Sequence, residues 1–291
     1  MKKNIGIIGF GNMGQAIAER IKAKYKVWVF DKDKNKTHRL KDISIADSCI
    51  DLVNKVEVII LAVKPQDYDA VLSEIKSVIK DNLVISIAAG ITTRYIENFL
   101  GKAKVIRVMP NIGAKIGKAE SSLCKGKKAK GEDLDFAKGL FNCIGKTWVM
   151  KEEMIDAATA ISGSGPAYIY YDMEVNKIDP LSVPEGIKQE YIKRLKEAAK
   201  GVGFDSQVAM DLAVSTTGSS LQLVAITGIS PAELKKQVIS KGGTTEAALK
   251  VLAEGASWAK AAKAAKKRAK ELSTTPRAYR NCAGVPFLGK E

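Results

Sequence analysis

The sequence predicts an α/β fold in which a doubly wound parallel sheet is followed by an all-helical C-terminal domain. Short β-branched runs alternate with helical stretches through the first half, the order that gives a parallel sheet covered by helices. A glycine-rich turn follows the first of these runs. From Glu152 onward, helical periodicity replaces the strand signals. These three observations place the sheet before the helices.

Six strands and five helices are expected in the first half, with boundaries that periodicity fixes to within a few residues. The strands are predicted at Asn4–Gly9, Lys26–Asp31, Val58–Val63, Leu83–Ile87, Lys104–Val108 and Thr147–Met150. The helices are predicted at Asn12–Lys24, Lys32–Lys41, Tyr68–Lys80, Thr92–Leu100 and Glu132–Cys143.

The second half is predicted to be helical as far as about Ser273. Two prolines and a glycine in residues 176–186 predict a break in the helix that starts near Pro166. The last residues show neither helical nor strand periodicity. We therefore expect a sheet domain over residues 1–158, a helical domain over residues 159–273 and a flexible tail over residues 274–291.

The composition indicates a folded globular protein with an uneven basic charge. The 291 residues are 46% hydrophobic and 27% charged, and 47 basic against 32 acidic side chains give a net charge of +15. Nine basic and two acidic residues fall in residues 259–291. In residues 259–270 alanines recur at helical spacing and no aromatic residue is present to stack on bases. This run predicts a helix with a solvated basic face, and nucleic acid is not expected as a partner.

The sequence carries no signal for a membrane or a metal. No apolar run approaches the roughly 20 residues that cross a bilayer, and Met1-Lys2-Lys3 leads directly into a predicted strand. The cysteines are scattered, without a C-x-x-C pair, at Cys49, Cys124, Cys143 and Cys282. Since this pattern is typical of a reducing compartment and lacks zinc-ligand spacing, we expect a cytoplasmic protein without a metal.

A glycine motif predicts the cofactor site. Gly9, Gly11 and Gly14 form G-x-G-x-x-G, with Asn12 and Met13 before the last glycine, and the motif opens a helix directly after the first strand. In this context it is the dinucleotide-binding fingerprint of a Rossmann domain. Gly9 permits a tight turn, Gly11 lets the backbone approach a pyrophosphate, and Gly14 lets the helix pack against the strand. The free N–H groups at the helix start then bind the phosphates.

The residues after the second strand leave the choice of cofactor open. Asp31 follows Gly9 by 22 residues, where an acid binds the ribose 2′-hydroxyl of NAD. Lys32 and Lys34 stand beside it and suit the 2′-phosphate of NADP if the acid turns outward. We therefore expect both NADH and NADPH to serve.

The proton donors that other oxidoreductases need are missing. No tyrosine is followed four residues later by lysine, and the single histidine, His38, lies just after the second strand, near the adenosine end of a cofactor. A hydroxy-acid dehydrogenase that depends on histidine is therefore excluded, as is a Ser-His-Asp hydrolase. A protonated imine, by contrast, already attracts hydride, so the protein need only position it and supply a hydroxyl that orients the ring nitrogen or relays its proton.

Four further motifs give the chain a close resemblance to a known family. They are Leu61-Ala62-Val63-Lys64-Pro65-Gln66, Arg107-Val108-Met109-Pro110-Asn111, Ile161-Ser162-Gly163-Ser164-Gly165-Pro166-Ala167-Tyr168 and Ser240-Lys241-Gly242-Gly243-Thr244-Thr245. Their order and spacing over residues 4–272 resemble the pyrroline-5-carboxylate reductases. The resemblance implies reduction of 1-pyrroline-5-carboxylate to L-proline by NAD(P)H, the last step of proline biosynthesis. It also implies that the helical domain is a dimerisation domain, in a homodimer or a larger ring of dimers.

The resemblance also implies roles for individual residues. Ala62, Val63, Lys64 and Pro65 match the family's loop beside the nicotinamide ribose, and Ser164 would line the substrate pocket. Gly242 and Gly243 open a predicted helix, whose free N–H groups suit a carboxylate. The resemblance assigns the substrate carboxylate to this turn, at Ser240, Gly242, Gly243 and Thr244, and makes Thr245 the catalytic hydroxyl near the ring nitrogen.

Three departures from the family pattern leave alternatives open. Lys241 stands where the family usually has proline, charged sequence interrupts residues 174–200, and the tail from Thr274 has no recognised counterpart. One alternative is a relative that reduces another cyclic imine or acts on a β-hydroxy acid. The β-hydroxy acid is the less favoured substrate, because the sequence lacks a lysine in a helix facing the nicotinamide. Another is a non-catalytic nucleotide-binding protein that uses its basic C-terminal helix as a contact surface.

Overall fold

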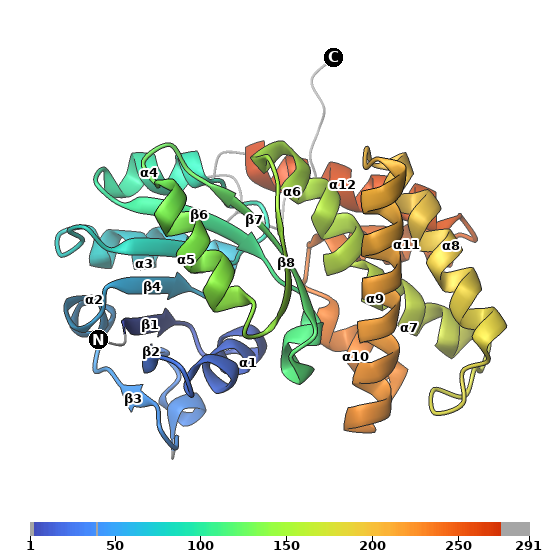
Figure 1. The fold of residues 1–291 in the computed structure, drawn as a ribbon, viewed down its shortest axis with the longest axis horizontal. Helices are drawn as coiled ribbons and strands as arrows, with labels where there is room; N and C mark the ends of the chain where they lie inside the picture. The colour runs from blue at the N-terminus through green and yellow to red at the C-terminus, as the bar shows by residue number, and fades with distance from the viewer. Residues whose placement is uncertain (1–2, 39, 275–291) are drawn as a thin grey trace.

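The computed structural model describes residues 3–38 and 40–274, with an eight-stranded sheet beside a group of helices (Figure 1). The sheet order is β3-β2-β1-β4-β5-β6-β7-β8, and all neighbouring pairs are parallel except β6 and β7. The strands are β1 (Asn4–Ile8), β2 (Lys26–Phe30), β3 (Ser44–Ile45), β4 (Val58–Leu61), β5 (Leu83–Ser86), β6 (Lys104–Met109), β7 (Ala119–Lys125) and β8 (Gly145–Val149).

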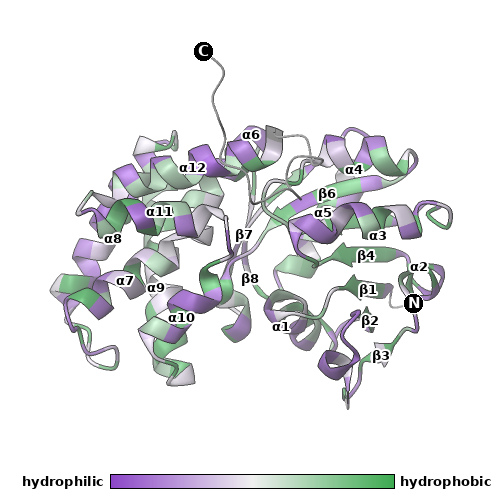
Figure 2. Cartoon of the chain, turned by 180° about the vertical axis from the view of Figure 1, so that it is seen from behind, coloured by the Kyte–Doolittle hydropathy of each residue, from purple (hydrophilic) through white to green (hydrophobic). Residues whose placement is uncertain are grey.

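Helices cover both faces of the sheet, as its alternating buried residues require. Ile7 of β1 and Ile60 of β4 pack against α1 (Asn12–Ile21) and α5 (Gly131–Phe141) on one face. Ile59 of β4 packs on the other face against α2 (Cys49–Lys55), α3 (Tyr68–Ile75) and α4 (Thr93–Leu100). The hydrophobic colour of β1 and β4 in Figure 2 marks the centre of this core. The predicted doubly wound architecture is therefore confirmed.

The second half is helical, as predicted, and forms a helical lobe with a core of its own. The helices are α6 (Glu152–Ala158), the π-helical turn η4 (Thr159–Gly163), α7 (Gly165–Val175), α8 (Glu185–Gly201), α9 (Ser206–Thr227), α10 (Pro231–Val238), α11 (Thr244–Ala253) and α12 (Trp258–Thr274). The predicted break is present, because α7 ends before residue 176 and α8 begins at Glu185. Tyr191 and Leu195 of α8 are buried in this core, so the charged segment around residues 174–200 includes a structural helix.

The charged run after the second strand was wrongly predicted as a helix. Instead of a helix over Lys32–Lys41, the structure has one short turn, η1 (Lys34–Thr37). The carboxylate of Asp31 accepts the N–H of Asp33, and that of Asp33 accepts the N–H of Asn35. Such side-chain to backbone bonds compete with helix formation, and only Thr37 in the turn is buried to favour it.

Three elements of the sheet domain were not predicted, namely α2, β3 and β7. The strand β7 is buried along residues 119–124 although its sequence, Ala-Glu-Ser-Ser-Leu-Cys, is largely polar, and it runs antiparallel to β6. The short 3₁₀ turns η2 (Pro65–Asp67) and η3 (Ile112–Ile116) complete the described chain. The predicted tail lies outside the described residues, apart from Thr274 at the end of α12, and so does Cys282.

Candidate active site

The glycine turn has the geometry that each of its glycines predicts. Gly9 has φ +98°, and a Cβ there would lie 2.7 Å from the backbone carbon of Ala62. A Cβ on Gly14 would lie 2.1 Å from the carbonyl oxygen of Gly9, whereas nothing approaches within 4 Å of the same position on Gly11. Since Gly11 is also the N-cap of α1 without a side-chain cap, the helix start offers free N–H groups beside open space. This arrangement fits a pyrophosphate.

Asp31 turns inward, toward the glycine turn. Its Oδ2 accepts the N–H of Phe10 at 2.7 Å, its Oδ1 lies 3.3 Å from the ammonium of Lys36, and 8% of its side chain is exposed. Burial would raise the pKa of Asp31, but the hydrogen bonds from Phe10, Asp33 and Lys36 outweigh it and lower the pKa below its ordinary value. The ionised carboxylate therefore fixes the turn and stays next to the expected ribose position.

The loop after β4 lies directly against the glycine turn. Ala62 donates its N–H to the carbonyl of Ile8 at 2.8 Å, next to Gly9. Val63 follows, Lys64 is exposed, and Pro65 opens η2. Lys32 is also exposed and pairs with Asp67 of η2 at 3.0 Å. The structure thus brings together the predicted cofactor residues Gly9, Gly11, Asn12, Met13, Gly14, Asp31, Lys32, Ala62, Val63, Lys64 and Pro65 along the ends of β1, β2 and β4.

The turn at residues 240–243 opens α11, as predicted. Gly242 has φ +69°, and the N–H of Gly243 donates to the carbonyl of Ser240 at 2.9 Å. Gly243 is the N-cap of α11 and provides no side-chain cap, so Thr244 and Thr245 occupy the first two helical positions. Ser240 and Lys241 are exposed beside this helix start. A carboxylate is the kind of group that such a helix N-terminus favours.

Three buried hydroxyls meet behind this turn. Ser164 Oγ lies 3.1 Å from Thr245 Oγ1 and 3.3 Å from Thr244 Oγ1, across a gap of about 80 residues in the sequence. Ser164 lies between η4 and α7, and Tyr168 one turn further donates its hydroxyl to the carbonyl of Ala160. Burial raises the pKa of Tyr168, which remains a neutral donor that fixes this junction. Ser164 is therefore brought together with the predicted residues of the 240s.

Two charged side chains engage the turn and were not predicted. The N–H of Gly242 donates to the carboxylate of Glu246, and Arg268 Nε donates to the carbonyl of Gly242 at 2.8 Å. Glu246 follows Gly243 by three residues, the spacing of a capping box, and this sequence signal was available. Arg268 belongs to the basic run expected to be solvated. Lys260, Lys263, Lys267 and Lys270 of that run are exposed, whereas Arg268 and Lys266 bond main-chain carbonyls.

The helical lobe contacts the sheet domain in the loops that follow β5 and β6. Asn111, at the end of β6, donates its side-chain amide to the carbonyl of Ser162 at 2.9 Å, and its Oδ1 accepts the N–H of Glu120. Leu272 of α12 packs on Gly90 in the loop after β5. The carboxyl ends of parallel strands meet at one edge, where ligands of this fold bind. Asn111 belongs to one of the four family motifs, but the sequence predicts no role for it; its burial in the structure indicates one.

The two parts of the chain match two family models. Residues 4–90 match the model described as NADP oxidoreductase coenzyme F420-dependent, and residues 186–272 match pyrroline-5-carboxylate reductase dimerisation. The chain is 34% identical to pyrroline-5-carboxylate reductase 2 of Bacillus subtilis over 86% of this chain and 87% of the relative. It is also 34% identical to the pyrroline-5-carboxylate reductase of Escherichia coli, over 87% of this chain and 91% of the relative.

Solved structures agree with these relatives. A pyrroline-5-carboxylate reductase from Coxiella burnetii aligns with a TM-score of 0.63 and 30% identity, covering 94% of this chain and 100% of that one. The Plasmodium falciparum pyrroline carboxylate reductase with NADP bound aligns with a TM-score of 0.61 and 26% identity, covering 94% and 98%. Together with the glycine turn and the hydroxyls of the 240s, these matches establish that the chain belongs to the pyrroline-5-carboxylate reductase family.

Proposed function

We propose that this protein reduces 1-pyrroline-5-carboxylate to L-proline with NADPH or NADH. The observation that carries the proposal is the pair of helix starts whose N-cap residue is a glycine without a side-chain cap, Gly11 for α1 and Gly243 for α11. The reaction adds one hydride to the imine carbon and one proton to the ring nitrogen, and releases NAD(P)⁺. The cofactor supplies the hydride when bound.

The chain's own residues bind the cofactor and the substrate, orient the imine and deliver the proton. The N–H groups at the start of α1 hold the diphosphate, Asp31 faces the ribose, and the loop of Ala62 and Val63 lies along the nicotinamide end. The N–H groups of the first residues of α11, after the N-cap Gly243, hold the substrate carboxylate, assisted by Ser240 and Thr244. The Thr245 hydroxyl orients the ring nitrogen or relays its proton, and Ser164, at 3.1 Å, sets the direction of that hydroxyl.

The single histidine of the sequence lies on another element than these hydroxyls, which suits an imine. His38 is exposed at the end of η1, on the adenosine side of the sheet. Among residues 3–38 and 40–274, no three His, Cys, Asp or Glu side chains gather as metal ligands do. A protonated imine needs no histidine, because its carbon already accepts hydride.

The dimerisation match and the free thiols support proposals for the oligomeric state and the location. The dimerisation match over residues 186–272 supports an oligomer, and we propose a homodimer or a ring of dimers built through the helical lobe. Its boundary with the dinucleotide-binding domain falls near residue 158, where the helical core begins. None of the described helices is long and apolar enough to cross a membrane. Cys49, Cys124 and Cys143 are free thiols, which supports the cytoplasm as the location.

Oxidation of NADPH with 1-pyrroline-5-carboxylate, with 1-pyrroline and without an imine tests the function. With 1-pyrroline-5-carboxylate the absorbance of NADPH falls, and without an imine it stays constant. With 1-pyrroline, which lacks the carboxylate, we expect KM to rise by about 10- to 100-fold, because a charged hydrogen bond is worth roughly 1.5–3 kcal/mol. No oxidation with either imine would refute the reductase. Equal KM values would instead remove the 240s turn from carboxylate binding.

A further inference from the structure

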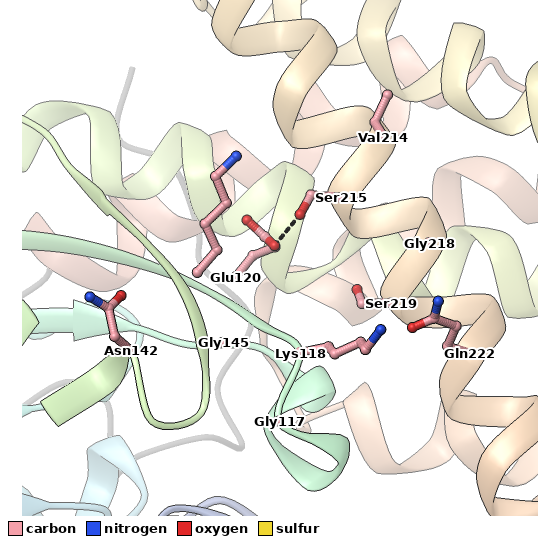
Figure 3. A pocket seen from close by; sticks show the side chains of 11 residues that line it. Gly117, Lys118, Glu120, Asn142, Gly145, Val214, Ser215, Gly218, Ser219 and Gln222 are labelled. Carbon is pink, nitrogen blue, oxygen red and sulfur yellow. Dashed lines mark hydrogen bonds between the residues drawn. The ribbon is translucent and has the colours of Figure 1, made fainter. Parts of the chain in front are cut away.

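A polar groove of about 590 Å³ lies between β7, β8 and α9, and none of the proposed cofactor or substrate residues lines it. Figure 3 shows its wall from the sheet on one side and from α9 on the other. The side chains that matter here are Lys118, Glu120 and Lys146 from the sheet domain, and Ser215, Ser219 and Gln222 from α9. Its volume is that of a small-molecule site.

The groove contains a buried carboxylate with no cation bonded to it. Glu120 is 2% exposed, and its two oxygens accept hydrogen bonds from the indole N–H of Trp148 and the hydroxyl of Ser215. Both donors are neutral, and no salt bridge involves Glu120 within the described residues. Burial raises the pKa of Glu120, and the two hydrogen bonds and the charge of Lys146 only partly offset it. A buried carboxylate in this condition favours a cationic partner.

The same groove presents two lysines that form no salt bridge within the described residues. Neither Lys118 nor Lys146 belongs to a salt bridge in the described part of the chain, and both are exposed. The ammonium of Lys146 lies 4.0 Å over the ring of Trp148. The side chain of Lys118 extends across the groove toward Gln222, as Figure 3 shows. These side chains favour an anionic group in the same groove as Glu120.

We propose that this groove binds a free α-amino acid, whose ammonium group pairs with Glu120 and whose carboxylate is held by Lys118 and Gln222. A zwitterion is the one small-ligand class that satisfies both signs of charge. A phosphate would meet the carboxylate of Glu120, and a bare metal ion would leave the lysines unused. Because Glu120 lies on β7 and Gln222 on α9, the bound amino acid bridges the sheet and the helical lobe.

Tryptophan fluorescence reports the occupancy of the groove through Trp148, whose indole bonds to Glu120, while Trp28 and Trp258 lie outside the groove and give a constant background. Full-length protein is titrated with L-alanine, L-serine and L-glutamine, and then with two blocked forms, N-acetyl-L-alanine and L-alaninamide. We expect a saturable change with at least one free amino acid and none with the forms that lack the ammonium or the carboxylate. Glu120→Gln should weaken binding at least 10-fold, and Lys118→Met by several-fold, while Thr245→Ala, outside the groove, leaves it unchanged.

Matched controls separate the groove from general charge effects. Lys127→Met, which removes an exposed lysine from the loop after β7, should leave the titration unchanged. Calorimetry with the same ligands gives a second readout that does not depend on the indole. The proposal is overturned if no free amino acid binds at millimolar concentrations, if Glu120→Gln binds as well as the natural chain, or if the blocked forms bind equally. Shielding of Trp148 from acrylamide in the oligomer would also overturn it, because a second subunit would then fill the groove.

Discussion

The starts of α1 and α11 are both proposed to bind an anionic group, but one is open and the other is occupied by polar groups of the protein. At the start of α1, Gly11 has no atom within 4 Å of the position of a Cβ, so the diphosphate site is made by leaving side chains out. At the start of α11, Ser240 Oγ lies 2.1 Å from the Cβ position of Gly243, and Glu246 and Arg268 engage the peptide groups of Gly242. The first site is open before its ligand arrives. The second is closed by the protein's own polar groups, which a substrate carboxylate must displace.

Among the substitutions that test this difference between the two helix starts, Thr245→Ala is expected to change activity most. The variant removes the hydroxyl that bonds Ser164 and that we place at the ring nitrogen. We expect kcat to fall by about 10- to 1,000-fold if the hydroxyl relays a proton, and by less if it only orients the ring, since single acid–base groups are worth about 10²–10⁴. Thr245→Ser is the matched control and should retain most activity. Unchanged kcat and KM in Thr245→Ala would remove this residue from the mechanism.

Gly14→Ala tests whether the diphosphate site at the start of α1 depends on the absence of a side chain at this position. The added methyl group would lie 2.1 Å from the carbonyl oxygen of Gly9, so the helix must move away from the strand. Overpacking of this kind costs about 1–3 kcal/mol, and we expect the Kd for NADPH to rise by about 10- to 100-fold. Gly139→Ala is the control, because no atom lies within 4 Å of its Cβ position. A tight NADPH complex in Gly14→Ala, measured by fluorescence titration, would contradict the role of this glycine.

Cofactor choice probes the ribose end of the same site. With Asp31 turned inward and Lys32 exposed at the surface, we expect kcat/KM for NADPH and NADH to lie within about 100-fold, or 2.7 kcal/mol. Lys32→Met should lower kcat/KM for NADPH by about 2- to 5-fold, the size of a surface ion pair, and leave NADH unaffected. Lys24→Met, at the end of the loop after α1, serves as the control. A preference for NADH above 100-fold would refute dual use.

Glu246→Gln tests whether the second helix start is closed by its own carboxylate. Removal of the negative charge beside the Gly242 N–H should lower KM for 1-pyrroline-5-carboxylate by about 2- to 5-fold, since charge at a helix terminus is worth roughly 0.3–1 kcal/mol. The KM for 1-pyrroline should not change. Glu254→Gln removes an exposed acid at the other end of α11 and is the matched control. A rise in KM would mean that Glu246 supports the turn rather than competing with the substrate.

The smallest effect concerns the pH dependence of stability at Glu120. Because burial raises its pKa in the folded state, folding favours the protonated form, and Glu120 costs stability at pH values above the folded pKa. That cost disappears as pH falls below the ordinary value of 4.5. We therefore expect Glu120→Gln to be more stable than the natural chain at neutral pH and equally stable in acid, as measured by urea unfolding. A stability difference that does not depend on pH would contradict this.

The sequence predicts the sheet and the glycine turn well because their causes are local. Continuous β-branched runs, buried on both faces of the sheet, identify β1 and β4, and the three glycines of the first turn each have a steric reason that can be read from spacing. The strand β7 escapes prediction because Glu120, Ser121 and Ser122 are buried by tertiary packing and not by their own polarity. The helix expected at Lys32–Lys41 fails because the Asp side chains bond the backbone instead.

The 240s turn was predicted as a helix start, but its surroundings were not. Ser164 reaches Thr245 across 81 residues, and Arg268 reaches Gly242 across 26. Contacts of this range depend on how α7, α11 and α12 pack, which residue periodicity does not specify. The resemblance to a family supplied Ser164 and Thr245. The spacing of Glu246 from Gly243 was a sequence signal that the prediction did not use, whereas Arg268 became visible only in three dimensions.

A crystal structure with NADP⁺ and L-proline bound together tests the central claim most directly. The account predicts the diphosphate at the start of α1 and the proline carboxylate on the N–H groups of residues 242–245. It also predicts the ring nitrogen at Thr245 Oγ1 and the reacting carbons about 3–3.5 Å apart. Proline bound away from residues 240–245, or separated from the nicotinamide by much more than this distance, would contradict it.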